Sequence, residues 1–417
     1  MGSKQFEYTV RALHCDHLAD DEEVYETLKR ATEPLTKAWD RLGAAKTIGI
    51  KFNQDFATAQ VPIFEGMRQT LVSDKVAKAV IRLLREKTDA DLFFTDTTVF
   101  HREDHTDVVD STQLASLMRE FDVPYVNANM PPLSVYPVPG GGQMFRQYVM
   151  PDRLMEVDEM VDVQRMKNHA FMGITLTLKN LFGLMPMREP EGRSRHYFHH
   201  LVRMPYMLAD IGRLFDPALN IIDGLVAQAG GEWSATGQES PRIMDVLIAG
   251  DHPVSTDAVG AYLMGHDPTS DWLTEPFHRD RNSLLVAAEG GYGTVRLDEM
   301  DWTSEVEPQP EGVFFAAMTD PIDRVISWRR TTCEQALYYR DHMRQFVDKY
   351  AGQYILLQMN EVRFHSDSSY LQVSRRELAG DHPEQGIFLK YVDPEEAEGE
   401  CFDVYERALA DMKARGL

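Results

Sequence analysis

Lysine is scarce in the middle of this chain, and the two lysines found there are the strongest candidates for chemistry. No lysine occurs from 88 to 166 or from 180 to 347, yet Lys167 and Lys179 stand twelve residues apart between these gaps. Unlike a guanidinium group, an ammonium group can lose its proton when buried, form an imine, or clamp a phosphate or carboxylate as a compact charge. We therefore expect a lysine-specific task at these positions, with a pair of surface lysines as the alternative.

The segment between the two lysines, KNHAFMGITLTLKNLFGLMP, sets polar groups in an apolar frame. Convergent polar groups inside such a frame are typical of a ligand site. We assign catalytic roles to Lys167, His169 and Lys179, with His169 as acid or base. The expected substrate-binding residues are Lys51, Asn53, Asn180, Arg188 and Asp223.

A histidine cluster follows in RSRHYFHH. His196 and His200 are four residues apart, so on a helix they would share a face and could ligate one metal ion. A carboxylate partner would complete a site suited to iron, manganese or zinc. The alternatives are that the histidines cap the helix or contact an anionic ligand, and that the aspartates cap backbone N–H groups. The candidate metal ligands are His196, His199, His200, Asp251 and Asp257, with Asp223 as a further carboxylate.

A second acidic stretch, FHREDHTD, places His101 and His105 beside Asp104 and Asp107. A metal could bind there, but an exposed, solvated loop is the preferred interpretation.

The order of the expected elements predicts an α/β fold with parallel or mixed sheets covered by helices. Apolar strands at 46–53, 91–98 and 123–129 alternate with helices that begin near Ser73 and near residue 111. Such a sheet binds ligands at the carboxyl ends of its strands, where Lys51, Asn53 and Asp96 fall. We further expect a strand at 5–13, a helix at 21–42, helices near 172–183, 196–215 and 254–265, and strands near 219–223 and 243–248.

Four segments are expected along the chain. They are an N-terminal strand-helix extension at 1–45, an α/β half at 46–150, a second α/β half with the Lys/His motif at 151–305, and a small α+β module at 312–417. The module is predicted to hold helices at 331–350, 368–379 and 396–415, a hairpin in QYILLQMNEVRFH and a strand in GIFLKYV. It carries ordinary surface charges, so we expect it to be separable and to serve docking or dimerisation.

Three ordered motifs give the chain a family resemblance. K-x-H followed by L-K-N-L-F-G, then IIDGLVAQAGGEWSATG and IAGDHPVSTDAVGAYLMG, is similar to the signature of the family called domain of unknown function 362. The resemblance covers roughly 46–300 and implies a fold and a site, since the activity of that family is not generally defined. Many members carry a ferredoxin-like cysteine module, which is missing here.

Cysteine usage and charge limit the function further. Cys15, Cys333 and Cys401 lie far apart, so we expect no resident iron–sulfur cluster and a reducing compartment. The formal net charge of -23 repels polyphosphate and anionic lipid, which argues against nucleic-acid or membrane partners. No apolar run of signal-peptide or membrane-spanning length is present, so we expect a cytoplasmic protein, with homo-oligomerisation left open.

Three functions compete. The first is an enzyme acting on a small anionic or carbonyl-bearing metabolite with Lys, His and a possible divalent metal. A sharper version notes that His169, Lys179 and His196 resemble the histidine, tethering lysine and nickel-binding histidine of nickel-pincer lactate racemases, although the glycine-rich stretch of those enzymes is absent. The second is an accessory protein that binds a metal or metabolite without turnover. The third is a scaffold whose site residues are relics.

Overall fold

The computed structural model describes most of the chain. The described residues are 6–54, 61–97, 112–187, 192–193, 195–232, 236–369, 377, 380 and 382–417, with the side chains at 195 and 196 left out. The expected helix at 368–379 and the stretch FHREDHTD therefore fall almost wholly outside them.

A nine-stranded sheet lies at the centre of the described residues. Neighbouring strands from β11 through β9, β2 and β5 to β6 are all parallel, whereas β12 is antiparallel to both of its neighbours, β11 and β1. The order is β13 (Asp301–Ser304), β1 (Thr9–His14), β12 (Ser240–Gly250), β11 (Leu219–Ala229), β9 (Glu159–His169), β2 (Thr47–Phe52), β5 (Asp91–Asp96) and β6 (Tyr125–Asn127), and β10 (Gly173–Thr175) pairs with β9. The two expected α/β halves thus share one sheet, and the expected N-terminal extension contributes β1 to it.

Helices cover both faces of this sheet, as the α/β prediction requires. On one face, α1 (Asp21–Thr32), α2 (Thr36–Ala44) and α3 (Asp74–Lys87) bury their apolar stripes in one core. On the other, α9 (Arg203–Phe215), α10 (Pro253–Leu263) and α11 (Ser283–Glu289) belong to a second core. Smaller elements are β3 (Ile63–Phe64), β4 (Met67–Arg68), α5 (Ala115–Glu120), β7 (Leu133–Pro137), β8 (Gln147–Pro151), α6 (Asp152–Met155), α8 (Arg195–Phe198) and η3 (Leu297–Glu299).

Several expected helices differ from the structure: the one at 196–215 is interrupted between residues 198 and 203, the one at 331–350 is interrupted at His342, and two more differ as follows. The expected helix at 21–42 is two helices, because Pro34 cannot donate a backbone hydrogen bond and ends the first of them. The expected helix near 172–183 begins instead as the strand β10 and continues as α7 (Thr177–Asn180) and η2 (Leu181–Leu184). The long strand β9, which carries Lys167 and His169, was not predicted at all, since its polar residues hide the alternation expected of a strand.

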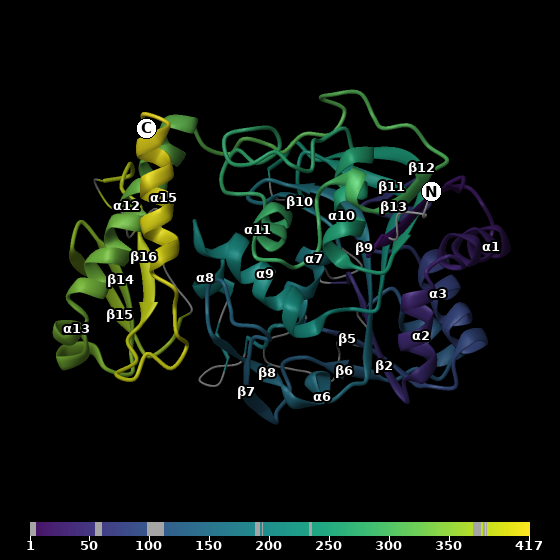
Figure 1. Cartoon of the computed structure of the whole chain (residues 1–417), viewed down its shortest axis with the longest axis horizontal. Coiled ribbons are helices and arrows are strands. Elements are labelled where there is room, and N and C mark those ends of the chain that lie inside the picture. The colour runs from purple at the N-terminus through teal and green to yellow at the C-terminus, as the bar shows by residue number, and fades with distance from the viewer. Residues whose placement is uncertain are drawn as a thin grey trace.

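The C-terminal module has the expected α+β composition. The hairpin and the following strand are confirmed as β14 (Tyr354–Gln358), β15 (Glu361–Ser366) and β16 (Phe388–Tyr391), which form a three-stranded antiparallel sheet. Its helices are α12 (Ile322–Asp341), α13 (Met343–Tyr350) and α15 (Asp403–Ala414). In Figure 1 these green to yellow elements stack beside α8 and α9, at the opposite end of the molecule from α1, α2 and α3.

The module is joined to the body by buried charges as well as by apolar packing. Arg203 of α9 donates to the Glu400 carboxylate at 2.8 Å, and both side chains have 0% exposure. Lys390 of β16 lies 3.0 Å from the other oxygen of Glu400, and Arg329 of α12 pairs with Asp280 of the body. Residues of β14 and β16 belong to the same core cluster as α9 and α10. This joint differs from the separable module expected from the sequence.

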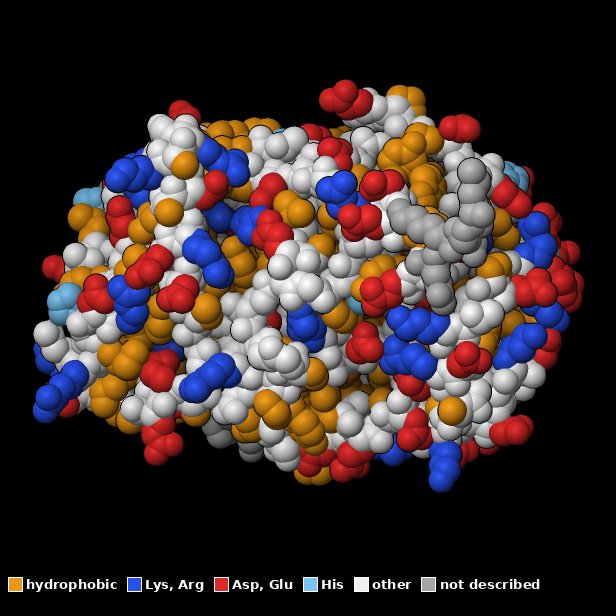
Figure 2. Space-filling view, viewed as in Figure 1, with side chains coloured by type: hydrophobic (Ala, Val, Ile, Leu, Met, Phe, Trp, Pro, Cys, Tyr) orange, Lys and Arg blue, Asp and Glu red, His pale blue; other side chains and the backbone are white. Residues whose placement is uncertain are grey.

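The acidity of the chain is dispersed over the surface in view. Figure 2 shows acidic and basic side chains interspersed on that face, rather than gathered in one patch of a single sign. Across the part of the chain that the structure covers, no helix is both long and apolar enough to cross a membrane.

Candidate active site at the carboxyl edge of the sheet

Four parallel strands end at the same edge of the sheet and deliver the predicted polar residues there. β2, β5, β9 and β11 run in one direction, so their carboxyl ends lie side by side. Lys51 lies near the end of β2, and Lys167 and His169 end β9. The expectation that the sheet would assemble these residues at its carboxyl edge is met by the topology.

Lys167 is fixed at this edge by neutral acceptors. Its side chain is 1% exposed, and its Nζ donates to Asn53 Oδ1 at 2.9 Å and to the Thr70 carbonyl at 3.2 Å. A buried ammonium group is costly unless it is paired or hydrogen-bonded, so these contacts fix its position. The predicted pair Lys167 and Asn53 is therefore in direct contact.

His169, Glu232 and Lys179 form a connected triad at the end of β9. The backbone N–H groups of Phe171 and Met172 donate to His169 Nδ1 at 2.9 and 3.1 Å. Because Nδ1 accepts, the proton of the neutral ring is on Nε2, which lies 3.2 Å from Glu232 Oε2. The other oxygen of Glu232 lies 3.3 Å from Lys179 Nζ. One carboxylate thus receives both the histidine and the lysine predicted to act together.

Burial and charge set the protonation states of this triad. Burial lowers the pKa of His169 from its usual value, and Glu232 opposes that shift only in part. Burial would raise the pKa of Glu232, but His169, Lys179 and Lys167 together hold it well below its usual range. The histidine is therefore neutral and the carboxylate ionised near neutral pH. The Glu232 side chain is 24% exposed, so the triad meets solvent on that side.

A second charged group lies beside the triad. Lys51 Nζ pairs with Asp96 Oδ2 at 2.9 Å, and Asn180 donates to the Asp162 carboxylate and, at 3.0 Å, to the Val163 carbonyl. Burial raises the pKa of Asp162 well above its usual range, against the effects of Asn180 and Lys51. A Cβ at Gly183 would stand 2.8 Å from Lys51 Cε, so only glycine lets η2 approach this pair.

The aspartates predicted as metal ligands have other partners. Asp257 accepts from the backbone N–H groups of Thr177 and Leu178 at 2.8 Å each and so caps α7, which carries Lys179. Asp251 accepts from the Thr9 backbone. Asp223 is fully buried and receives Arg165 at 2.7 Å and the Ser73 backbone at 2.8 Å. All three aspartates accept backbone N–H groups, as the capping alternative describes, and metal ligation by them stays a prediction.

The three predicted histidines are not equivalent. The His199 ring centroid lies 6.4 Å from that of His169 and 5.1 Å from that of Phe182, so His199 borders the triad. His200 faces the C-terminal module, where its Nε2 accepts from the Leu389 backbone at 3.1 Å. The His196 side chain and all of Arg188 lie outside the described residues.

Within the described residues, one group of His, Cys, Asp and Glu side chains has the spacing of a metal site, and it lies elsewhere. It consists of Asp16, His17 and Asp245. Its spacing follows from ordinary hydrogen bonds, since His17 Nδ1 lies 2.7 Å from the Asp245 carboxylate, which also accepts from the His17 backbone.

Sequence reasoning missed two carboxyl groups of the candidate site. Glu232 stands in AQAGGEWSATG, part of the second family motif, and is the one charged residue of that stretch. Asp162 stands two residues after Met160 in β9, the strand that was not predicted. Recognising β9 would have placed Asp162 beside Lys51, its register partner on β2.

A known family matches the segment that carries most of these residues. The family model described as Domain of unknown function (DUF362) matches residues 62–262. Residues 62–262 belong to that family. The DUF362 segment contains Lys167, His169, Lys179, Glu232 and Asp257, whereas Lys51, Asn53 and the C-terminal module lie outside it.

One curated relative matches part of the chain. The thylakoid-associated protein sll1697 of Synechocystis sp. (strain ATCC 27184 / PCC 6803 / Kazusa) is 23% identical over 213 residues, which is 49% of this chain. The match spans 60% of that relative's length.

Proposed function

We propose that Lys167, His169, Lys179 and Glu232 form an active site for a small anionic or carbonyl-bearing metabolite, on which the His169 and Glu232 pair transfers a proton. The observation that carries this proposal is the convergence of a lysine and a neutral histidine on one ionised carboxylate that solvent can reach. A general acid and base need such a pair within hydrogen-bond distance of one another and of a bound substrate.

The charge balance of the site favours an anionic ligand. Lys51, Lys167 and Lys179 supply three positive charges, and Asp96 and Glu232 supply two negative charges. Burial raises the pKa of Asp162 well above its usual range, which favours the neutral form of this carboxyl group. The named groups thus leave one positive charge in surplus. A carboxylate, phosphate or polarised carbonyl oxygen would compensate it in a poorly solvated site, where such interactions are strong.

The contacts of Lys179 favour an electrostatic role over a covalent one. Its Nζ forms an ion pair with Glu232, and an ammonium in an ion pair is a poor nucleophile until the pair is broken. A tethered cofactor of the kind suggested by the racemase resemblance would require that break. Lys179→Arg separates the two roles, since arginine keeps the charge but forms no imine or tether.

Binding of small anions tests the proposal directly. Pyruvate, lactate, acetate and inorganic phosphate would be titrated calorimetrically into the wild type and into Lys179→Met and His169→Gln variants. We expect at least one anion to bind the wild type and to lose roughly tenfold or more in affinity with Lys179→Met, as befits loss of a charge-assisted contact. Lys29→Met is the matched control, because Lys29 forms a lysine–glutamate pair with Glu86 at the surface. The proposal fails if no anion binds, or if Lys179→Met binds like the wild type.

Turnover and metal content separate the remaining alternatives. A binding protein would retain the anion without changing it, whereas an enzyme would exchange a substrate proton for solvent deuterium in a Glu232-dependent manner. A divalent metal at the 196–200 cluster stays a prediction, as do the cytoplasmic location and homo-oligomerisation. Metal analysis of untagged protein tests the first of these, with His196→Ala as the variant expected to lose any bound ion.

A further inference from the structure

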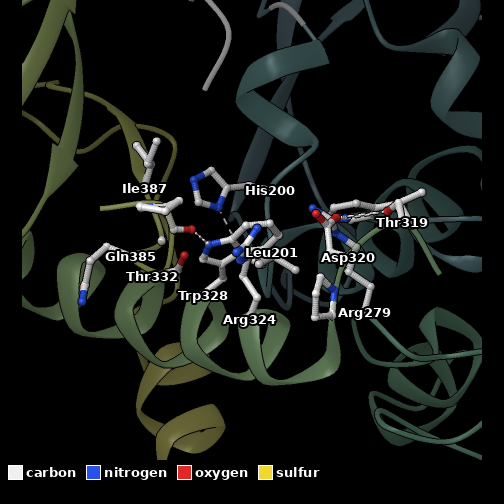
Figure 3. Close-up of a pocket in the computed structure, with 14 residues that line it drawn as sticks. His200, Leu201, Arg279, Thr319, Asp320, Arg324, Trp328, Thr332, Gln385 and Ile387 are labelled. Atoms are coloured by element: carbon white, nitrogen blue, oxygen red, sulfur yellow. Dashed lines mark hydrogen bonds and ion pairs between the residues drawn. The ribbon is translucent and has the colours of Figure 1, made fainter. Parts of the chain in front are cut away.

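A cavity of about 400 Å³ lies where the C-terminal module meets the body of the protein. Its floor is α12, from which Arg324 and Trp328 reach toward His200, as Figure 3 shows. The pair of Arg279 and Asp320 stands at one end of the view, and Gln385 and Ile387 stand at the other. Its volume falls in the range of small-molecule sites in proteins.

The walls of the cavity are mostly apolar, and two of them are aromatic. Phe171 comes from the body and Trp328 from the module, and the Arg279 guanidinium carbon lies 4.9 and 5.4 Å from their ring centroids. Trp328 is held in place because its Nε1 donates to the Pro383 carbonyl at 2.7 Å. Leu201, Pro321 and Ile387 add aliphatic surface. A flat apolar molecule would match this lining.

The charged groups of the cavity are unbalanced toward the positive. Arg279 donates to Asp320 at 2.6 Å, while its buried Nε has no hydrogen-bond partner among the described residues. Arg324 is exposed and forms no ion pair within the described part of the chain. Two cations therefore face one carboxylate, and at least one donor lacks an acceptor. An anionic group on the ligand would pair with Arg324 and lie near the Arg279 guanidinium.

We propose that this cavity binds an organic anion with a planar apolar body and a single carboxylate. The apolar body lies against Trp328 and the aliphatic lining of Leu201, Pro321 and Ile387, and the carboxylate lies against Arg324 and Arg279. Neither part of the protein forms this site alone, because Phe171 and Arg279 come from the body whereas Arg324 and Trp328 come from the module. The module is thus a component of a binding site and not only a docking element.

The cavity site is distinct from the triad site of the proposed function but lies next to it. Phe171 lines the cavity, and its backbone N–H is one of the two donors that hold His169 Nδ1. Its ring centroid is 5.9 Å from that of His199, which borders the triad. Binding of a ligand in the cavity is therefore expected to change the surroundings of His169.

Titration of the full chain with trans-cinnamate tests the cavity site. Cinnamamide serves as the neutral counterpart of that probe, and acetate serves as the anion without an apolar body. We expect cinnamate to bind at least about tenfold more tightly than either, since each lacks one of the two contacts. Arg324→Gln should weaken cinnamate by a similar factor and leave folding intact, because Arg324 is exposed. Arg330→Gln, an exposed change on the same helix that does not line the cavity, should have no effect.

Variants at both sites distinguish this proposal from the proposed function. Trp328→Ala, checked by its melting curve, should weaken cinnamate, whereas Lys179→Met should leave cinnamate binding within about twofold of the wild type. The cavity site would be overturned if cinnamate does not bind or if cinnamamide binds equally well. It would also be overturned if Arg324→Gln and Trp328→Ala both bind cinnamate with wild-type affinity. Loss of cinnamate binding in Lys179→Met alone would also overturn it, while supporting the anion site at the triad.

Discussion

Two networks of buried charge in this protein have different designs. At the joint between body and module, Arg203, Lys390 and Arg193 face Glu400, Glu396 and Glu398, so positive and negative charges are equal in number. Arg203 and Glu400 have 0% exposure. At the carboxyl edge of the sheet, the triad reaches solvent through Glu232, and Lys167 is held by neutral acceptors beside the balanced pairs of Lys51 with Asp96 and of Lys179 with Glu232.

The difference indicates which buried charges serve folding and which serve ligands. A balanced network built around a fully buried pair leaves little opportunity for a ligand, and breaking that pair leaves an uncompensated charge in the interior. An open network with a surplus charge is incompletely satisfied until something binds. We therefore expect substitutions at the joint to change stability strongly, and substitutions at the triad to change binding and turnover more than stability.

Removing the module should have the largest effect. Deletion of 312–417 would leave Arg203 and Asp280 without their ionic partners and would uncover the core shared with β14 and β16. We expect the truncated chain to be insoluble or unfolded, measured as soluble yield and far-ultraviolet circular dichroism. Recovery of a soluble chain with a cooperative melt would show that the module is separable, as the sequence suggested.

A single change inside the joint should be the next most severe. Glu400→Ala removes the carboxylate shared by Arg203 and Lys390, and such a break costs about 3–5 kcal/mol because it leaves buried cations unpaired. Urea denaturation of the full chain measures this loss. Glu406→Ala on α15 is the control, since Glu406 pairs with Arg340 at the surface and should cost about 1 kcal/mol or less. Equal effects of the two changes would show that the joint is not a structural network.

The sequence predicted the parallel strands well because their apolar runs and turn residues are local signals. The strands 46–53, 91–98 and 123–129 correspond to β2, β5 and β6, and Ser73 caps α3 as expected. The sequence did not predict the strand β9, in which Asp162, Gln164, Arg165 and Lys167 are all buried. Their burial depends on partners far away in the sequence, which no local pattern contains.

The residue types of the candidate site could be predicted from the sequence, but the contacts between those residues could not. Scarcity of lysine marked Lys167 and Lys179, and the topology brings them together with His169. The partner Glu232 is 53 residues from Lys179 along the chain, and only the fold places it there. The sequence could not assign a role to the aspartates, because a carboxylate before a turn or helix has the same sequence signature whether it caps N–H groups or binds a metal.

A buried histidine outside both networks provides a reference for the pH dependence of stability. His252 is packed between the rings of Tyr8 and Tyr292, and burial lowers its pKa from 6.5 to about 3. As the pH falls, this histidine is protonated in the unfolded chain before it is protonated in the folded chain. The free energy of unfolding is therefore highest above about pH 6.5, and below pH 6.5 it decreases by up to about 1.4 kcal/mol per pH unit. His252→Phe keeps the ring packing and should remove about 2 kcal/mol of the loss between pH 7 and pH 5.

Urea denaturation at the two pH values measures this difference. The corresponding slope from His169 is expected to be shallower, because Glu232 favours its protonated form and opposes the effect of burial. His169→Gln should therefore change the pH dependence less than His252→Phe does. The reverse order would contradict the conclusion that Glu232 opposes the effect of burial on His169.

The smallest effect on stability, and the sharpest test of the triad, is expected from Glu232→Gln. Solvent reaches this side chain, and the amide can still accept from Lys179 or His169, so the change should cost about 1 kcal/mol or less. Loss of its negative charge increases the positive surplus, so a small anion such as pyruvate should bind several-fold more tightly. Proton exchange on a bound substrate should nevertheless stop, because the base is gone. Calorimetry measures the change in anion binding, and solvent-deuterium exchange on the same preparation measures the loss of proton transfer. Weaker anion binding in Glu232→Gln would mean that the carboxylate contacts the ligand itself, and unchanged exchange would assign the base elsewhere.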